Sequence, residues 1–226
     1  MTHRMLSFWT EEKSLSVFLV LLVLQIFVIA PLTTGGQFYL YMLNGLVGSL
    51  FLLSGVLTLT HDRLSRWIAS GFVVVAMVAR WLVLTAPSPW LHIADSVLTL
   101  CFATALTTVV LHNVYKEGPV SGHRVRGSVA AYLLLGYFFA AAYRLTHDLV
   151  PEAFTLNTAL LDQGQNLSGI FMYFSLVTLT TVGFGDVTAV HPVARSLVTL
   201  EGVVGTLYPA ILIARLVSLH SESAKK

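Results

Sequence analysis

The chain has 226 residues, of which 56% are hydrophobic and only 11% are charged, and its formal net charge is +2. With a mean hydropathy of +0.79, it is too apolar for a soluble globular domain, which indicates an integral membrane protein. A single cysteine, Cys101, excludes an intrachain disulfide framework. The small net charge gives no indication of nucleic-acid binding, and we expect none.

Six apolar runs along the chain approach the length of about 20 residues that a membrane helix needs. They are Ser14 to Ala30, Phe38 to Leu59, Trp67 to Ala86, Trp90 to Val110, Ser128 to Leu149 and Val193 to Leu219. We interpret the first run as a retained span, because no clear small-residue cleavage site follows it. The sequence therefore predicts an all-α membrane protein with six transmembrane helices.

Lys and Arg residues gather at alternate ends of these runs. They precede the first run, separate the second from the third and the fourth from the fifth, and close the chain: Arg4, Lys13, Arg63, Arg66, Lys116, Arg124, Arg126, Arg215, Lys225 and Lys226. The turns at 33–37 and 85–89 carry none. The positive-inside rule then predicts that both termini are cytoplasmic and that the loop before the last span is outside.

Two glycines two residues apart, Gly183 and Gly185, mark an unusual loop between the last two spans. An extended strand alternates its carbonyl groups, so lining a pore on one side requires backbone angles that glycine adopts at low cost. Val182 and Phe184 would then point backward into protein and brace the strand. Thr181 can add a hydroxyl oxygen at the inner end. Such a row of oxygens is suited to a dehydrated cation.

The run Thr181-Val182-Gly183-Phe184-Gly185, here called the filter segment, resembles the Thr-Val-Gly-Tyr-Gly selectivity filter of potassium channels, with Phe184 in place of Tyr. The preceding residues 173–180 resemble the pore helix. The pattern Glu201-Gly202-x-x-Gly205-x-x-Tyr208, followed by residues 214–217, resembles the inner helix of prokaryotic six-span channels.

This resemblance implies a re-entrant pore helix and filter loop between the fifth and sixth spans, and assembly with three identical subunits as a homotetramer in membrane lipid. The implied activity is passive, potassium-selective conduction. The carbonyl groups of Thr181, Val182, Gly183 and Phe184 would bind K⁺, and no other cofactor is expected. The implied location is a prokaryotic inner membrane.

The resemblance also divides the chain into four parts. Residues 1–112 would form a four-helix transmembrane domain with voltage-sensor-like topology, and residues 113–127 a cytoplasmic linker interrupted by Gly118, Pro119 and Gly122. Residues 128–220 would form the pore domain, and residues 221–226 a short cytoplasmic tail. Since no Arg or Lys occurs from Trp90 to Leu111, and each gating charge supplies only ~2.3 kcal/mol per 100 mV, strong voltage gating is not expected.

Further residues are expected to support the filter. By matching position these are Tyr173, Val177, Thr180 and Asp186, with Tyr173 and Asp186 able to hydrogen-bond behind the filter. Val177 stands where some bacterial relatives have Glu, and Phe184 lacks the hydroxyl of Tyr, so packing would be the main brace. We interpret Asn166 or Ser168 as the cap of the pore helix.

The last span carries the residues expected to bend or gate the pore. Glycines permit bending or close helix approach, and a proline removes a helix hydrogen bond. Apolar residues at the inner end would form a constriction where four helices converge. The candidates are Gly202, Gly205, Pro209, Ile213, Leu216 and Val217.

Charged residues inside spans are expected to be paired or functional. Arg80 and Asp95 reach similar depths in the third and fourth spans, which predicts an ion pair. Glu201 is expected to be a buried carboxyl hydrogen-bonded near the pore helix, or a carboxylate that influences ions. Arg144, Asp148 and Arg195 are expected to form pairs near the outer surface.

Two alternatives stay open at the sequence level, and two others are not expected. A filter that differs at one residue can belong to a weakly selective cation channel, or to a non-conducting channel-like subunit. An enzyme is not expected, because no nucleophile motif accompanies His92 and Asp95. A secondary transporter would be expected to show duplicated halves, and the filter loop has no counterpart in the first half.

Overall fold

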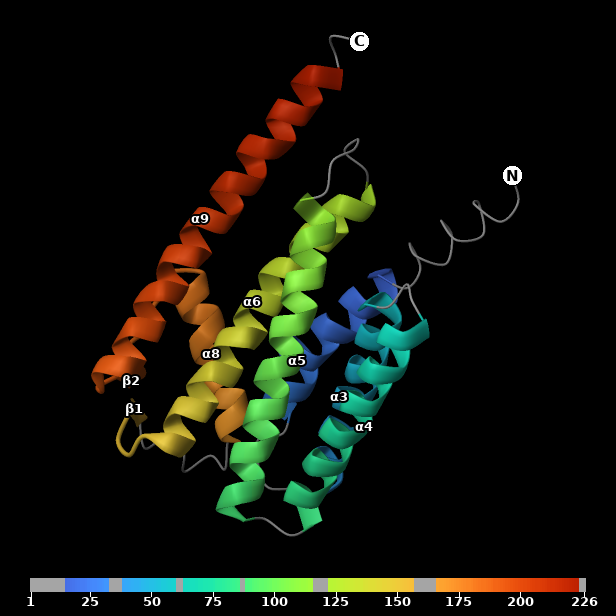
Figure 1. The fold of residues 1–226 in the computed structure, drawn as a ribbon. Coiled ribbons are helices and arrows are strands. Elements are labelled where there is room, and N and C mark those ends of the chain that lie inside the picture. The colour runs from blue at the N-terminus through green and yellow to red at the C-terminus, as the bar shows by residue number, and fades with distance from the viewer. Residues whose placement is uncertain are drawn as a thin grey trace.

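A computed structural model describes residues 15–32, 38–59, 63–85, 88–115, 122–156 and 166–223. Figure 1 shows a mostly helical chain. Residues 15–23 are helical, and the elements that follow are η1 (Leu24–Ile29), α2 (Ala30–Leu32), α3 (Phe38–Leu59), α4 (Arg63–Thr85), α5 (Pro89–Tyr115), α6 (Gly122–Leu149), β1 (Phe154–Leu156), α8 (Leu167–Leu179), β2 (Val187–Ala189) and α9 (Pro192–Ser223). Residues 221–223 of the predicted tail belong to α9, while residues 224–226 and most of the interrupted part of the predicted linker lie outside the described residues.

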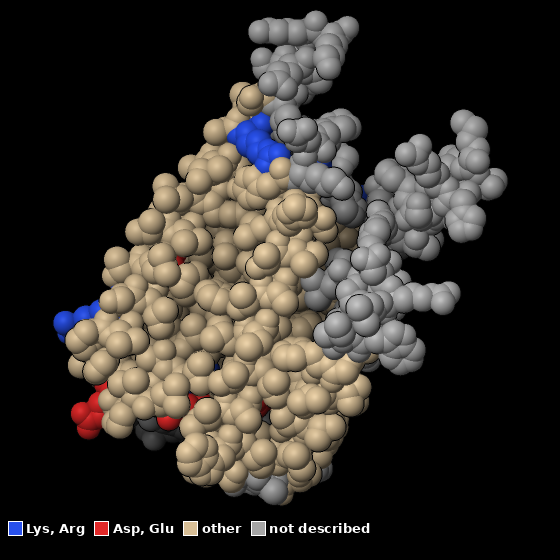
Figure 2. Space-filling view, viewed as in Figure 1, with Lys and Arg blue, Asp and Glu red and all other residues tan. Residues whose placement is uncertain are grey.

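Three helices within the described ranges are long and apolar enough to cross a membrane: Pro89–Tyr115, Arg124–Leu149 and Pro192–Arg215. Figure 2 shows a face that is almost free of charged residues across its middle, with Lys, Arg, Asp and Glu mainly toward its two ends. An uncharged band between charged ends is the surface that a bilayer requires. The chain is an integral membrane protein, and the prediction of six spans goes beyond these three helices.

Helix α6 is the centre of the fold. It contacts α5, α8 and α9, and Figure 1 shows it running between α5 and α9. The most apolar part of α6 is 67% buried, against 33% for α5 and 17% for α9. Its buried face includes the small residues Ala130, Ala131, Ala140 and Ala141, which allow neighbouring helices to approach closely.

Aromatic rings join the first helices to α6. Phe51 of α3 packs against Phe18, Phe102 of α5 and Tyr137 of α6, with ring centroids 5.4, 5.9 and 5.4 Å apart. Phe18 and Phe51 are fully buried. Aromatic pairs at such distances stabilise packing beyond the area that they bury. The helical segment 15–32, α3 and α5 therefore form one packed unit with α6.

The first helix ends in a π-helical turn that the sequence did not predict. The Ala30 N–H donates to the Gln25 carbonyl, five residues back. Pro31 has no N–H, and in a regular α-helix its ring would crowd the Phe27 carbonyl, so a wider last turn accommodates it. The Ala30 carbonyl then lies near the start of α8, 3.3 Å from where a Cβ at Gly169 would be.

Two details of the fold were not predicted. Helices extend into the predicted linker, residues 113–127, because α5 continues to Tyr115 and α6 already begins at Gly122. Residues 123–127 contain no proline to oppose the helix, and Gly127 packs near the Val114 side chain. The described fold is also not entirely helical, since β1 and β2 form an antiparallel pair in which Phe154 faces Ala189 and Leu156 faces Val187.

The small sheet lies beside the filter segment. Strand β2 follows the filter segment directly and pairs with β1, whose Phe154 is buried against Phe171 and Phe174 of α8, with centroids 5.0 and 6.0 Å apart. Extended backbone leaving the filter segment has no helical hydrogen bonds, so β1 supplies partners for it. The sheet thereby fixes the far end of the filter segment to α8.

Helix α9 approaches the end of α8 at a glycine. A Cβ at Gly205 would overlap the carbonyl group of Leu179, the last residue of α8. Pro209 lies four residues later inside an uninterrupted α9, so the Gly205 carbonyl receives no helix hydrogen bond from it. The position of Gly205 is set by close packing, which is the use that small residues commonly have in membrane proteins.

The Gly205→Ala substitution should therefore push α9 away from α8. Overpacking of this kind costs about 1–3 kcal/mol, and we expect a lower thermal unfolding midpoint for the detergent-purified protein. The matched control is Gly71→Ala on α4, where no atom lies within 4 Å of the new Cβ and where alanine favours the helix. Equal midpoints for the two variants would contradict the assigned packing.

Candidate functional site

The start of the short helix α8 is capped by a side chain. Asn166 takes extended backbone angles, and its side-chain oxygen accepts a hydrogen bond of 3.0 Å from the Ser168 N–H. This confirms the predicted capping, with Asn166 as the capping residue. Ile170, Phe171 and Phe174 bury one face of the helix. The cap therefore fixes where α8 begins, and the helix ends at Leu179.

The backbone of the filter segment is hydrogen-bonded to the last carbonyl groups of α8. The Val177 carbonyl accepts from the Val182 N–H at 2.9 Å and from the Gly183 N–H at 3.4 Å. The Thr181 N–H donates to the Thr178 carbonyl at 2.9 Å, and the Thr180 hydroxyl donates to the Leu176 carbonyl at 2.7 Å. The Val177 carbonyl therefore holds the filter segment directly, whereas the Thr180 hydroxyl bonds back to α8.

Backbone angles alternate along the filter segment. Thr181, Gly183 and Gly185 have positive φ of 61°, 56° and 78°, while Val182 and Phe184 between them do not. The two glycines take this conformation at low cost, as the sequence predicted. Thr181 is less expected, because a left-handed conformation costs a residue with a side chain roughly 1–2 kcal/mol. Alternation of this kind turns successive carbonyl groups toward one side.

The side chains of the filter segment are not covered by this chain. Val182 is 54% exposed and Phe184 is 70% exposed in the single chain, so the burial of both side chains in protein stays a prediction for an assembly of copies. No atom lies within 4 Å of a Cβ built at Gly183 or Gly185. Helix α8 lies to one side of the segment and contacts it through backbone groups and through the ring of Tyr173.

Tyr173 and Asp186 meet behind the filter segment. The Tyr173 hydroxyl donates to Asp186 Oδ2 at 2.8 Å, and the Val187 N–H donates to Asp186 Oδ1 at 3.1 Å. The Tyr173 ring stacks on Phe184 with centroids 6.4 Å apart and an angle of 4°.

Helix α9 shows no constriction within the described part of the single chain. Ile213 is 61% exposed and Val217 is 64% exposed, and the side chain of Leu216 lies outside the described residues. A Cβ added at Gly202 would meet no atom within 4 Å, unlike one at Gly205. Pro209 lies within a continuous helix. A hinge or gate role for these residues therefore stays a prediction.

Two tyrosines connect α9 to α6 and α8: Tyr208, which is part of the inner-helix pattern, and Tyr132, for which no contact was predicted. The Tyr208 hydroxyl donates to the Ser128 carbonyl at 2.9 Å, and its ring stacks on Tyr132 with centroids 5.8 Å apart. The Tyr132 hydroxyl donates to the Leu179 carbonyl at 3.1 Å. Two tyrosines within apolar spans are the signal that could have indicated these contacts, because buried hydroxyls need partners.

The C-terminal part of α9 also reaches α5 directly. Arg215 donates a hydrogen bond to the Tyr115 carbonyl, and its guanidinium lies 4.8 Å from the centroid of the Tyr115 ring. A cation over an aromatic face is attracted by the ring. The last helix of the pore-like region is thus attached to the end of α5 without the intervening linker.

Glu201 is completely buried where α6, α8 and α9 meet. Its carboxyl oxygens contact the hydroxyls of Tyr143 of α6 and Ser175 of α8. This confirms the prediction of a buried carboxyl hydrogen-bonded near the pore helix. The partners could not be foreseen, because they precede Glu201 by 58 and 26 residues.

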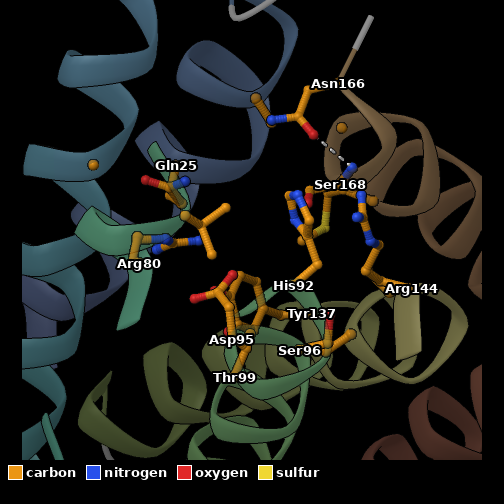
Figure 3. Close-up of a pocket in the computed structure, with 17 residues that line it drawn as sticks. Gln25, Arg80, His92, Asp95, Ser96, Thr99, Tyr137, Arg144, Asn166 and Ser168 are labelled. Atoms are coloured by element: carbon orange, nitrogen blue, oxygen red, sulfur yellow. Dashed lines mark hydrogen bonds between the residues drawn. The ribbon is translucent and has the colours of Figure 1, made fainter. Parts of the chain in front are cut away.

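Arg80 of α4 and Asp95 of α5 face one cavity of about 150 Å³ beside the start of α8 (Figure 3). Their charges interact, but no ion pair within 4.0 Å joins these two described residues, so the predicted direct contact is wrong. The Arg80 guanidinium lies instead against Gly48 of α3 and beside the Tyr137 hydroxyl.

The predicted surface charges are only partly paired. Arg144 and Asp148 form an ion pair of 3.0 Å, with side chains 15% and 12% exposed, and the Ser96 hydroxyl donates to Asp148 at 3.1 Å. The pair is therefore largely buried and not solvated. Arg195 donates instead to the Ala189 carbonyl at 3.2 Å, which attaches α9 to β2.

Comparison with known proteins bears on the second half of the chain. Residues 131–222, less than half of the chain, match a family model described as an ion channel. No curated protein and no solved structure matches. The matched region contains most of α6, then α8, the filter segment and α9. The match of residues 131–222 to an ion-channel model indicates ion transport as the role of this part of the chain.

Proposed function

We propose that the chain is one subunit of a homotetrameric potassium channel that conducts K⁺ passively through the filter segment. The observation that carries this proposal is the alternation of positive φ at Thr181, Gly183 and Gly185 within a motif of the potassium-filter type. The match of residues 131–222 to an ion-channel family supports conduction. Potassium would be bound by the carbonyl groups of residues 181–184, with the Thr181 hydroxyl at the inner end.

Carbonyl oxygens select for potassium by replacing the hydration shell of the ion. A single strand provides one wall of such a cage, and copies related by cyclic symmetry provide the others. The exposure of Val182 and Phe184 supports this step, because neighbouring copies could cover them. The filter segment would then be braced from both sides, by its own α8 and by an adjacent subunit.

The remaining features of the proposal follow from the sequence. Six spans with cytoplasmic termini would place the filter segment near the outer face of a prokaryotic inner membrane. Helix α5 has no Arg or Lys, so we do not expect the first four spans to gate strongly by voltage. Bending at Gly202 and Pro209, and closure at Ile213, Leu216 or Val217, would be the gating elements.

The Gly183→Ala substitution tests the filter directly. Alanine at a φ of 56° is strained by roughly 1–2 kcal/mol in each subunit, so the carbonyl row should be lost. With purified protein in a planar bilayer, potassium on one side and sodium on the other, we expect a reversal potential near the potassium limit. The variant should give a potential near zero or no current, while Gly71→Ala should behave as wild type.

Other outcomes separate the alternatives. A wild-type reversal potential near zero with large currents would mean a weakly selective cation channel. A tetrameric protein that stays silent at every voltage and pH tried, and that also shows no potassium flux in vesicles, would favour a non-conducting subunit. A selective current that Gly183→Ala leaves unchanged would contradict conduction through this filter segment.

The Tyr173→Phe substitution tests the support behind the filter. It removes the hydroxyl that donates to Asp186 and keeps the ring that stacks on Phe184. A hydrogen bond to a charged group contributes about 1.5–3 kcal/mol, so we expect the current to decline faster when external potassium is low. Asp186→Ala should have a similar effect, and the double variant should be no worse than Asp186→Ala alone. Strict additivity would show that the two side chains act separately.

A further inference from the structure

Glu201 is the point at which three helices of the ion-channel domain are joined by side-chain hydrogen bonds. Its Oε1 lies 2.5 Å from Ser175 Oγ of α8, and its Oε2 contacts the Tyr143 hydroxyl of α6. Ser175 Oγ also lies 2.7 Å from the Gly136 carbonyl of α6. Three short contacts therefore link one carboxyl group, two hydroxyls and one carbonyl.

Counting protons distinguishes the two forms of this carboxyl group. A serine hydroxyl has one proton, and a carbonyl group can only accept. If Ser175 donates to Gly136, its contact with Glu201 needs a proton from Glu201. If Glu201 is ionised, only the Tyr143 and Ser175 protons are available for three contacts, and two oxygen atoms meet without a proton between them. The protonated acid satisfies all three contacts.

The charge around Glu201 favours the same form. The ion pair found among the described residues, Arg144–Asp148, does not involve Glu201, and no described Lys or Arg lies within 4.0 Å of it. The titratable groups that face it are Tyr132 and Tyr143 of α6, and from α8 the neutral Ser175. A buried carboxylate without a cation is very unfavourable, whereas the neutral acid is not.

We infer that Glu201 is a protonated, neutral carboxylic acid that donates to Ser175 and accepts from Tyr143, and that it positions α8 between α6 and α9. Ser175 lies two residues before Val177, whose carbonyl holds Val182 and Gly183. Glu201 thus acts on the filter segment through α8 without touching an ion. The effect on selectivity rests on the proposed function, but the protonation state does not.

Infrared difference spectroscopy tests the protonation state by itself. Wild-type protein in lipid at neutral pH should show the carbonyl band of a protonated carboxylic acid, and Glu201→Gln should lack it. Glu152→Gln is the matched control, because Glu152 is an exposed glutamate, and it should keep the band. Absence of the band from wild type at neutral pH would overturn the inference, whether or not the protein conducts.

Rescue by the conservative variant tests the positioning role. Glutamine can donate from its amide to Ser175 and accept from Tyr143, as the neutral acid does. Alanine leaves the buried Tyr143 hydroxyl without an acceptor and removes the donor to Ser175 Oγ, which keeps only its contact with Gly136. We expect Glu201→Ala to reduce the yield of assembled protein roughly tenfold or more, and Glu201→Gln to restore most of it, with the wild-type reversal potential. Glu201→Gln as damaging as Glu201→Ala would show that the carboxylate is required and would overturn the inference.

Discussion

The carbonyl groups at the end of α8 are the constraint on which the filter segment depends. The last carbonyl groups of a helix have no partners within it, and here those of Leu176, Val177 and Thr178 accept N–H groups from residues 180–183. The filter segment is therefore joined to the helix by hydrogen bonds and is not a free loop. A displacement of α8 would be passed directly to the backbone of residues 181–185, so every contact that places α8 also shapes the filter segment.

Small and polar residues, more than large apolar ones, place α8 in the fold. Lipid tails are as apolar as leucine, so apolar side chains alone do not distinguish a helix neighbour from lipid. Gly136 lets the side chain of Leu176 approach α6, and Gly205 lets α9 reach the end of α8. Ser175 hydrogen-bonds inside this interface to Gly136 and Glu201. These directional contacts fix the rotation and depth of α8, which apolar packing leaves free.

Local patterns predicted the elements, while contacts between distant residues could not be predicted. The apolar run Phe38 to Leu59 was predicted and forms α3. The hydrogen bond between Tyr173 and Asp186 was also predicted, and its two residues are only 13 positions apart in the sequence. The partners of Glu201 come from two other helices and follow no sequence spacing. The similar membrane depth of Arg80 and Asp95 correctly predicted that both side chains face one cavity. Depth does not determine how each helix is rotated about its axis, so it did not predict that the Arg80 guanidinium lies against Gly48. The positive φ of Thr181 opposes its local preference, so only the surrounding hydrogen bonds explain it.

The filter segment presents two requirements that one chain does not meet. Its carbonyl groups need water or ions, because unsatisfied backbone groups cannot face lipid. Its side chains Val182 and Phe184 are apolar and exposed, which disfavours water on that side. Helix α9 is similarly uncovered, with only 17% of its most apolar part buried. A ring of copies around an aqueous axis would meet both requirements, since each copy would cover the apolar side of its neighbour while the carbonyl groups face the axis.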